Sequence, residues 1–353
     1  MPPKMKLTVF NAHPYDKKYI GAVHSAREAP SDIELSFHEF PLSQETIALA
    51  SHADAVCVFV NDDLSAPVLD GLHAAGVQAI LLRCAGYNNV DLDRAKELGL
   101  FVANVPSYSP ETVAEFTLAL IQTLNRNTHR AYNRVREGNF NLDGLLGKTL
   151  HGKTAGVIGT GRIGVSLARI LKGFGCNILA FDPFENDEFR KYGAYTDLDT
   201  LLSSSDIVSL HCPLMPKTRY IINEQTIAKM KKGAMLVNTS RGALIDTRSV
   251  IQALKSKQLG GLALDVYEGE SKIFYRDHST TNAIIDDDML MRLMTFPNVI
   301  ISGHQAFFTE EALGEIAEVT LRNLEHFRDG KICPNSLISD TPPRRGLFPV
   351  RTI

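Results

Sequence analysis

The chain has 353 residues, of which 44% are hydrophobic and 22% charged, close to the averages for soluble globular proteins. At about 150 residues per domain, that length favours two or three domains. Lysine plus arginine number 37 and aspartate plus glutamate 40, for a net charge of −3. This balance argues against nucleic-acid-binding and membrane-surface proteins, because both usually carry a strongly basic face.

The cysteines and the N-terminus indicate the compartment. Five cysteines contain no CxxC pair, which fits a reducing environment. The apolar stretch near the N-terminus is only Leu7–Phe10, too short for the core of a signal peptide. No apolar run is long enough to span a bilayer. We therefore expect a cytoplasmic protein with no membrane or nucleic-acid partner and no metal site.

The first hundred residues alternate short apolar runs with helix-like segments. Ser65 is placed to cap a helix that Gly76 would end, and the segment 91–99 has the same pattern. Alternating strands and helices predict a parallel sheet covered on both faces. The predicted strands are Lys6–Phe10, Ile33–Phe37, Ala55–Val60, Gln78–Arg83 and Leu100–Ala103.

A long helix is predicted next. Ser109 can cap it, Pro110 suits its first position, Glu111 complements the helix dipole, and Gly138 is the next strong stop signal. We expect this helix to leave the first unit and open the second. Its apolar side chains recur every three or four residues, at Val113, Phe116, Leu120 and Leu124.

A second sheet is predicted from about His151 onward. Helices are expected at Ile163–Phe174 and around Ser249–Lys255. A last helix, Glu310–Arg328, is expected to return to the first unit, and the tail from Pro334 to be surface or disordered. The predicted strands are Thr154–Ile158, Asn177–Phe181, Ile207–Leu210, Ala234–Asn238, Gly261–Asp265 and Val299–Ile301.

A dinucleotide-binding fingerprint follows the first strand of the second sheet. Gly159, Gly161 and Gly164 form a GxGxxG pattern between a predicted strand and helix, and Asp182 follows at the end of the next strand. The first glycine permits a tight turn, the second lets a pyrophosphate approach, and the third allows close packing. The amino end of the helix favours the phosphates. A packing turn without a ligand is the weaker alternative.

The charges around Asp182 predict NAD over NADP. Asp182 is placed to accept hydrogen bonds from the adenine ribose hydroxyls. A 2′-phosphate there would also meet Glu185, Asp187 and Glu188, with no basic residue before Arg190. Repulsion between like charges disfavours the phosphate.

Three kinds of charged side chain follow predicted strands of the second sheet. They are Arg241, one of Glu268 and Glu270, and His304. Ligands of open α/β sheets bind at the carboxyl ends of strands. An arginine can hold a carboxylate and polarise the adjacent carbonyl. A histidine can exchange the alcohol proton, and a nearby glutamate stabilises its imidazolium form. Spacing alone also allows a structural histidine, a surface ion pair and a solvated glutamate.

The motifs taken together resemble the D-2-hydroxyacid dehydrogenases, with the NAD-dependent D-lactate dehydrogenases as the most similar branch. The similarity runs from about Lys6 to Asn335. It rests on seven segments and on FVNDD at Phe59–Asp63. The segments are NTSRGALID (Asn238–Asp246), DVYEGE (Asp265–Glu270), SGHQAFFTEEAL (Ser302–Leu313), RCAGYNNVD (Arg83–Asp91), PSYSP (Pro106–Pro110), TAGVIGTGRIG (Thr154–Gly164) and HCP (His211–Pro213).

This resemblance implies a role for each matching residue. Arg241, Glu270 and His304 fall on catalytic positions, and Glu268 does not. Ala85, Gly86, Tyr108 and Phe307 match substrate-binding positions. Beyond the three glycines and Asp182, the implied cofactor contacts are Arg162, Ile163, Cys212, Pro213, Thr239, Ser240 and Asp265.

The expected fold is α/β, with two doubly wound, Rossmann-like parallel-sheet domains and a cleft between them. The substrate-binding, flavodoxin-like domain would comprise residues 1–107 and 305–335, the NAD-binding domain 108–304, and a tail 336–353. The resemblance implies hydride transfer between NADH and pyruvate or a similar small 2-oxo acid, in a homodimer or higher homo-oligomer. Two alternatives remain: an NAD-binding corepressor on the same scaffold, and a reductase of another 2-oxo acid such as glyoxylate or hydroxypyruvate.

Overall fold

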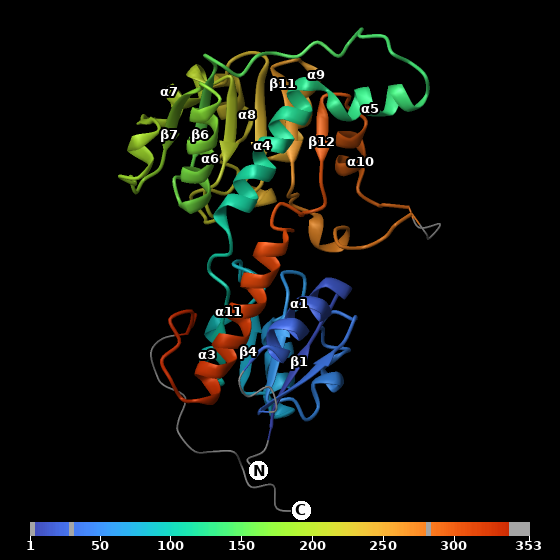
Figure 1. The fold of residues 1–353 in the computed structure, drawn as a ribbon, viewed down its shortest axis with the longest axis vertical. Coiled ribbons are helices and arrows are strands. Elements are labelled where there is room, and N and C mark those ends of the chain that lie inside the picture. The colour runs from blue at the N-terminus through green and yellow to red at the C-terminus, as the bar shows by residue number, and fades with distance from the viewer. Residues whose placement is uncertain (1–3, 28–31, 280–283, 339–353) are drawn as a thin grey trace, which may run out of the picture. The chain divides into compact units, whose positions relative to one another are not determined.

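The computed structural model describes residues 4–27, 32–279 and 284–338. These residues fall into two units, each with its own sheet (Figure 1). Unit 1 runs up to Ser109 and resumes at Thr309, and unit 2 is Pro110–Phe308. The expected α/β class with two parallel sheets is confirmed. Within the described residues, no helix has both the length and the apolar character needed to cross a membrane.

The sheet of unit 1 has the strand order β2-β1-β3-β4-β5, with every pair of neighbours parallel. This is the order of flavodoxin-like sheets. The two inner strands β3 and β4 are buried along their whole length, as continuous apolar runs require. All five predicted strands are present, with ends shifted by a residue or two: β1 (Met5–Val9), β2 (Ile33–Phe37), β3 (Ala55–Val58), β4 (Ala79–Leu82) and β5 (Phe101–Ala103).

One helix of unit 1 was not predicted. Helix α1 begins with a capping box, in which the Asp16 carboxylate accepts the His13 backbone N–H at 2.9 Å. It buries only Asp16 and Ile20, too few apolar residues to give a clear periodic signal. Figure 1 shows α1 beside α11 on the same sheet. The helices of this unit are α1 (Pro14–Ser25), α2 (Ala66–Ala74), α3 (Leu92–Glu97) and α11 (Glu310–Arg328).

Helix α11 returns to unit 1, as predicted, and has the predicted bounds. Thr309 caps it by accepting the Ala312 N–H at 3.3 Å. Its buried face packs on α1 and β4. The chain beyond it, from Pro334 to Ile338, is exposed or half-buried, in agreement with the predicted surface position, and Ser336 pairs with Ala103 at the edge of β5. The rest of the predicted tail, 339–353, lies outside the described residues.

The sheet of unit 2 has the order β12-β11-β10-β9-β6-β7-β8, again with parallel neighbours. The order reverses between β6 and β9, and ligands of such sheets bind at this switch point. Six strands were predicted; the short β8 was not. The strands are β6 (Thr154–Ile158), β7 (Asn177–Phe181), β8 (Ala194–Tyr195), β9 (Ile207–Leu210), β10 (Ala234–Asn238), β11 (Leu259–Leu264) and β12 (Val299–Ile301).

The predicted long helix is wrong in one respect: it is two helices. Helix α4 (Pro110–Arg126) ends at Asn127, whose φ of 52° is left-handed, and α5 (Thr128–Arg136) follows in a new direction. Asparagine tolerates this conformation better than most residues. Helix α4 buries one apolar face, whereas α5 has no buried residue. Packing of an apolar face therefore stabilises α4, whereas no buried face requires α4 to continue as one helix beyond Asn127.

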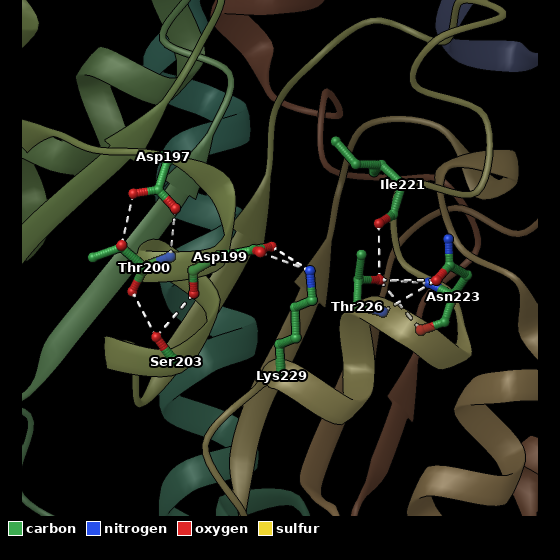
Figure 2. A network of polar contacts seen from close by, with 8 residues as sticks. All are labelled: Asp197, Asp199, Thr200, Ser203, Ile221, Asn223, Thr226 and Lys229. Carbon is green, nitrogen blue, oxygen red and sulfur yellow. Dashed lines mark hydrogen bonds and ion pairs between the residues drawn. The ribbon is translucent and has the colours of Figure 1, made fainter.

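Two short helices of unit 2 are held by polar caps (Figure 2). Asp197 caps α7 (Leu198–Ser204) by accepting the Thr200 N–H at 2.9 Å. Asn223 caps α8 (Glu224–Lys229) in a capping box, and the Lys229 ammonium joins the two helices by an ion pair to Asp199 at 2.7 Å. Neither helix was predicted. The other helices of unit 2 are α6 (Arg162–Gly173), α9 (Thr247–Lys255) and α10 (Asp288–Met294), of which α10 was also not predicted.

Candidate active site

The carboxyl ends of three neighbouring strands of unit 2 lie side by side. The ladder places Asn238 of β10 beside Leu264 of β11, and Leu264 beside Ile301 of β12. The loops that follow carry Arg241, Glu270 and His304 respectively. The structure therefore brings the three loops with the predicted catalytic residues to the same edge of one sheet.

His304 and Glu270 form a direct pair. The imidazole Nδ1 lies 2.8 Å from a Glu270 carboxylate oxygen, and each side chain is 18% exposed. The other carboxylate oxygen accepts the Tyr267 backbone N–H at 2.8 Å. Because a carboxylate only accepts hydrogen bonds, Nδ1 carries the hydrogen of this pair. Nε2 is then the atom that can exchange a proton with a ligand.

The backbone of His304 is in the left-handed region, with φ of 55°. Such a conformation costs about 1–3 kcal/mol in a residue other than glycine and persists only where the surroundings impose it. Here the His304 N–H donates to the Asp265 carbonyl at 2.8 Å. The fully buried Asp265 carboxylate accepts the backbone N–H groups of Gln305 and Ala306, each at 2.9 Å, and the Ser302 hydroxyl at 2.6 Å. Asp265, an expected cofactor contact, thus holds the loop that carries His304.

Arg241 is half-buried immediately before the 3₁₀ turn Gly242–Leu244. Its guanidinium donates one hydrogen bond to the Ser240 carbonyl at 2.7 Å. The turn is fixed by the Asn238 side chain, which donates to the Arg241 carbonyl and accepts the Ser240 N–H. A guanidinium has five N–H donors, so this arrangement leaves it the capacity to hold a carboxylate.

The Arg241 and Glu270 loops touch. A side chain at Gly242 would collide with the backbone of Tyr267 and Glu268, so only glycine lets the two loops approach this closely. Glu268 does not join the pair with His304, because its carboxylate accepts the Tyr220 hydroxyl at 2.8 Å. Of the two glutamates that spacing left open, Glu270 is the one beside His304.

The glycines of the fingerprint lie at the switch point of the sheet. Gly159 has a left-handed φ of 98°, and a side chain there would collide with the loop after β9. A side chain at Gly164 would collide with the Gly159 carbonyl, which explains the close helix–strand packing. At Gly161, the N-cap of α6, a Cβ would meet nothing within 4 Å, and the helix has no side-chain cap. This turn fits a pyrophosphate.

Asp182 follows β7, on the other side of β6 from the β9 loop. One carboxylate oxygen accepts the Thr160 N–H at 2.7 Å, and the other accepts the Phe184 N–H at 2.9 Å. The Thr160 hydroxyl in turn accepts the Tyr195 hydroxyl at 2.8 Å. The carboxylate is therefore fixed at the end of β7, where the fingerprint predicts the adenine ribose.

We expect reduction with NADH to have a much higher kcat/KM than reduction with NADPH. The basic residue nearest along the chain, Arg190, forms ion pairs with Glu185 and Asp187, so its charge is already compensated. A 2′-phosphate would face the Asp182 carboxylate without a cation of its own. Initial rates with both cofactors measure the ratio. A preference for NADPH would contradict the charge argument.

The remaining predicted cofactor contacts of unit 2 follow strands β9 and β10 or begin helix α6. Cys212 and Pro213 follow β9, and the Cys212 carbonyl accepts the Ser240 hydroxyl at 2.8 Å. The Thr239 hydroxyl pairs with that of Thr117 in α4 at 2.8 Å. Arg162 and Ile163 form the first turn of α6. Among the described residues, no group of three or more His, Cys, Asp or Glu could hold a metal ion.

The protonation of His211, which precedes Cys212, should make the free energy of unfolding depend on pH. Burial lowers the pKa of His211 to about 4, and its Nε2 lies 2.8 Å from the Ser209 hydroxyl. Between pH 6.5 and 4 the unfolded chain binds more protons at this position, so stability falls as the pH falls. The expected loss is about 2 kcal/mol between pH 7 and pH 5.

Urea unfolding at the two pH values should show a smaller pH dependence in His211→Gln than in the wild type. His73→Gln, which changes an exposed histidine of α2, is the control and should keep the wild-type dependence. Equal pH dependence in all three proteins would contradict the assignment of this loss to His211.

The predicted substrate residues are divided between the units. Ala85 and Gly86 follow β4 in unit 1, where the Asn104 amide donates to the Ala85 carbonyl at 2.8 Å. The buried Cys84 thiol donates to the Gly86 carbonyl at 3.2 Å. Tyr108 is half-buried near the end of the same unit. Phe307 belongs to unit 2, shortly after His304, and is buried.

One residue beside His304 was not predicted. Tyr275 donates its hydroxyl hydrogen to the His304 carbonyl at 3.0 Å, and its ring lies 5.9 Å from the imidazole. It belongs to none of the motifs that carry the family resemblance. Only the folding of the loop after β11 brings it to His304, so no local sequence signal could have identified it.

Comparison with known proteins agrees with this geometry. Residues 118–306 match the family described as D-isomer specific 2-hydroxyacid dehydrogenase, NAD binding domain. The chain is 66% identical over 334 residues to the D-lactate dehydrogenase kk1H of Curvularia clavata, covering 95% of each protein. It matches the apo-structure of D-lactate dehydrogenase from Escherichia coli with a TM-score of 0.86 and 50% identity, over 95% of this chain and 100% of that one.

A second solved structure shares the fold. It is the D-isomer specific 2-hydroxyacid dehydrogenase of Lactobacillus delbrueckii ssp. bulgaricus in its NAD complexed form, with a TM-score of 0.78 and 31% identity. The match covers 94% of this chain and 100% of that one. A region of more than half the chain thus matches an NAD-binding domain, and close relatives match nearly all of it. The chain belongs to the D-isomer specific 2-hydroxyacid dehydrogenase family.

Proposed function

We propose that the protein is an NAD-dependent D-lactate dehydrogenase, which interconverts pyruvate and D-lactate. The observation that carries the proposal is the His304–Glu270 pair at 2.8 Å, in loops whose strands β12 and β11 end in line with β10, the strand before Arg241. The 66% identity to a protein named D-lactate dehydrogenase, over 95% of both chains, supports the choice of substrate.

The three catalytic residues have distinct roles in the reduction. When bound, NADH supplies the hydride. The Arg241 guanidinium holds the substrate carboxylate by charge-assisted hydrogen bonds and polarises the adjacent carbonyl. His304 gives a proton from Nε2 to the substrate oxygen, and takes it back in the reverse reaction. The Glu270 carboxylate stabilises the imidazolium and holds the ring by its Nδ1–H.

Further residues bind and select the substrate. Ala85 and Gly86 donate backbone N–H groups to the substrate carboxylate. Their loop is well suited to this, because its carbonyls are engaged by Asn104 and Cys84. Tyr108 and Phe307 limit the size of the substrate side chain. Unit 1, which carries Ala85, Gly86 and Tyr108, is the proposed substrate-binding domain, and unit 2, which carries the dinucleotide fingerprint, the proposed NAD-binding domain.

A panel of 2-oxo acids tests the proposal. NADH oxidation is followed with pyruvate, glyoxylate, hydroxypyruvate and branched 2-oxo acids, and the product of pyruvate is analysed for chirality. We expect the highest kcat/KM with pyruvate and D-lactate as the product. A higher value with another acid would reassign the substrate. NADH binding without turnover of any acid would instead indicate a corepressor-like protein.

We also propose that the protein is a homodimer or higher homo-oligomer. Helix α5 and the loop after it expose four large apolar side chains. Figure 1 shows the segment after α5 as a long loop. We infer that a second copy of the chain covers these side chains, because each copy presents the same set. They are Tyr132 (61% exposed), Phe140 (73%), Leu142 (79%) and Leu146 (94%).

The mass of the native particle tests this assignment. Light scattering should give twice the chain mass or more for the wild type, and close to one chain mass for Leu142→Asp/Leu146→Asp. Ile332→Ser changes another exposed apolar residue, 72% exposed and in unit 1, and should keep the wild-type mass. A wild-type monomer would contradict the proposal.

We propose that the protein resides in the cytoplasm. All five cysteines are free and buried, so the fold is stabilised without disulfides, as in reducing compartments.

A further inference from the structure

The loop that carries Glu270 contacts His304 at a second point. Tyr275 lies further along this loop and donates its hydroxyl hydrogen to the His304 carbonyl oxygen at 3.0 Å. Its ring and the imidazole have centroids 5.9 Å apart and planes tilted by 36°. One loop therefore contacts the imidazole through Glu270 and the backbone of the same residue through Tyr275.

The backbone contact bears on where the imidazole points. His304 is left-handed, with φ of 55°, and Tyr275 is too, with φ of 63°. Residues with a Cβ adopt this region rarely, so neighbouring groups must hold them there. The His304 N–H is held by the Asp265 carbonyl, and its C=O by Tyr275. The backbone conformation sets the direction of the Cα–Cβ bond and hence of the imidazole.

The loop itself has a small core. Tyr267, Phe274 and Leu290 are buried together, at 5%, 8% and 3% exposure, and Tyr275 packs against them. The Tyr267 hydroxyl donates to the Asp287 carboxylate at 2.9 Å, which attaches the loop to the N-cap of α10. The Tyr275 hydroxyl is thus presented from a packed segment, as accurate placement of a reactive group requires.

We propose that Tyr275 is a positioning residue for proton transfer: its hydroxyl holds the His304 backbone so that the imidazole keeps its orientation between Glu270 and the substrate. The proposal rests on the role of His304 proposed above. Tyr275 is not itself a proton donor to substrate, because its hydroxyl hydrogen is directed to a backbone carbonyl.

Tyr275→Phe tests the proposal, since it removes the hydroxyl and keeps the ring. We expect kcat for pyruvate reduction to fall about tenfold, as small displacements of a catalytic group do, with an unchanged KM for NADH. The deuterium isotope effect on kcat, with NADH labelled at the transferred position, should rise above the wild-type value because chemistry becomes slower relative to product release. A structural role alone would not raise it.

Tyr220→Phe is the matched control. Tyr220 also has a left-handed φ, of 51°, and its hydroxyl also donates into this loop, to Glu268, whereas the glutamate that pairs with His304 is Glu270. Tyr220→Phe should leave kcat and the isotope effect unchanged. Tyr275→Leu, which removes the ring as well, should lower kcat further than Tyr275→Phe.

The outcomes separate this inference from the proposed function. Wild-type kcat and isotope effect in Tyr275→Phe, with an inactive His304→Ala, would overturn the role of Tyr275 alone. A fall in kcat together with lost NADH binding and a lowered melting temperature would also overturn it, in favour of a structural role. An active His304→Ala would overturn the proposed function itself.

Discussion

His304→Ala should lower kcat for pyruvate reduction by about 10²–10⁴-fold, the usual effect of losing a general acid. NADH binding, measured by fluorescence titration, should be retained, because the predicted cofactor contacts lie at other strand ends. The reason for the loss is geometric: only one imidazole nitrogen is engaged by Glu270, and Nε2 is the proton-exchanging atom. Without it, the alkoxide formed by hydride transfer has no placed proton donor.

A second histidine of the same loop region provides the control. His278 is half-buried, and its ring nitrogen contacts the Ile273 carbonyl at 2.9 Å, with no catalytic role assigned to it. His278→Ala should keep kcat within a few-fold of the wild type. If His304→Ala also kept it, the pair with Glu270 would be structural.

The inner strands could be predicted because they are buried on both faces. β3 and β4 consist of apolar residues with no exposed position. Such continuous apolar runs can be identified as strands from the sequence without knowing which strands they pair with. The fingerprint turn was equally clear, because a strand, three glycines, a helix and a distant acid occur in the required order. Helix α11 had a buried stripe and a threonine cap, so its bounds were predicted correctly.

The missed helices are those without such a stripe. Helices α7, α8 and α10 have six or seven residues and are stabilised by capping side chains, such as Asp197 and Asn223. The same capping residues are common in turns, so the sequence alone does not distinguish the two. The break at Asn127 was missed for a related reason: asparagine gave no stop signal as strong as glycine.

The candidate site was only partly accessible from the sequence. Arg241 and His304 could be placed, since each follows a strand closely. The choice between Glu268 and Glu270 could not be made by spacing, because both follow β11 in one loop. The structure decides it by the contact of Gly242 with that loop and by the two separate hydrogen-bond partners, Tyr220 and His304.

Arg241→Ala should lower kcat/KM for pyruvate by about 10²–10³-fold. The guanidinium is half-buried and donates only one hydrogen bond within its own turn, to Ser240, which leaves donors for a substrate carboxylate. Removing one partner of such a desolvated charge pair costs about 2–5 kcal/mol. Because the same group polarises the carbonyl, kcat should fall and KM for pyruvate should rise.

Two further variants separate the causes of that loss. Arg241→Lys keeps the charge but loses the planar fork, so its kcat/KM should lie between those of the wild type and Arg241→Ala. Arg248→Ala, at an exposed position of α9, is the control for removing one positive charge elsewhere in unit 2, and its kcat/KM should equal that of the wild type. A KM for pyruvate that stays at the wild-type value in Arg241→Ala would mean that the substrate carboxylate is held elsewhere, and the assignment of Arg241 would fall.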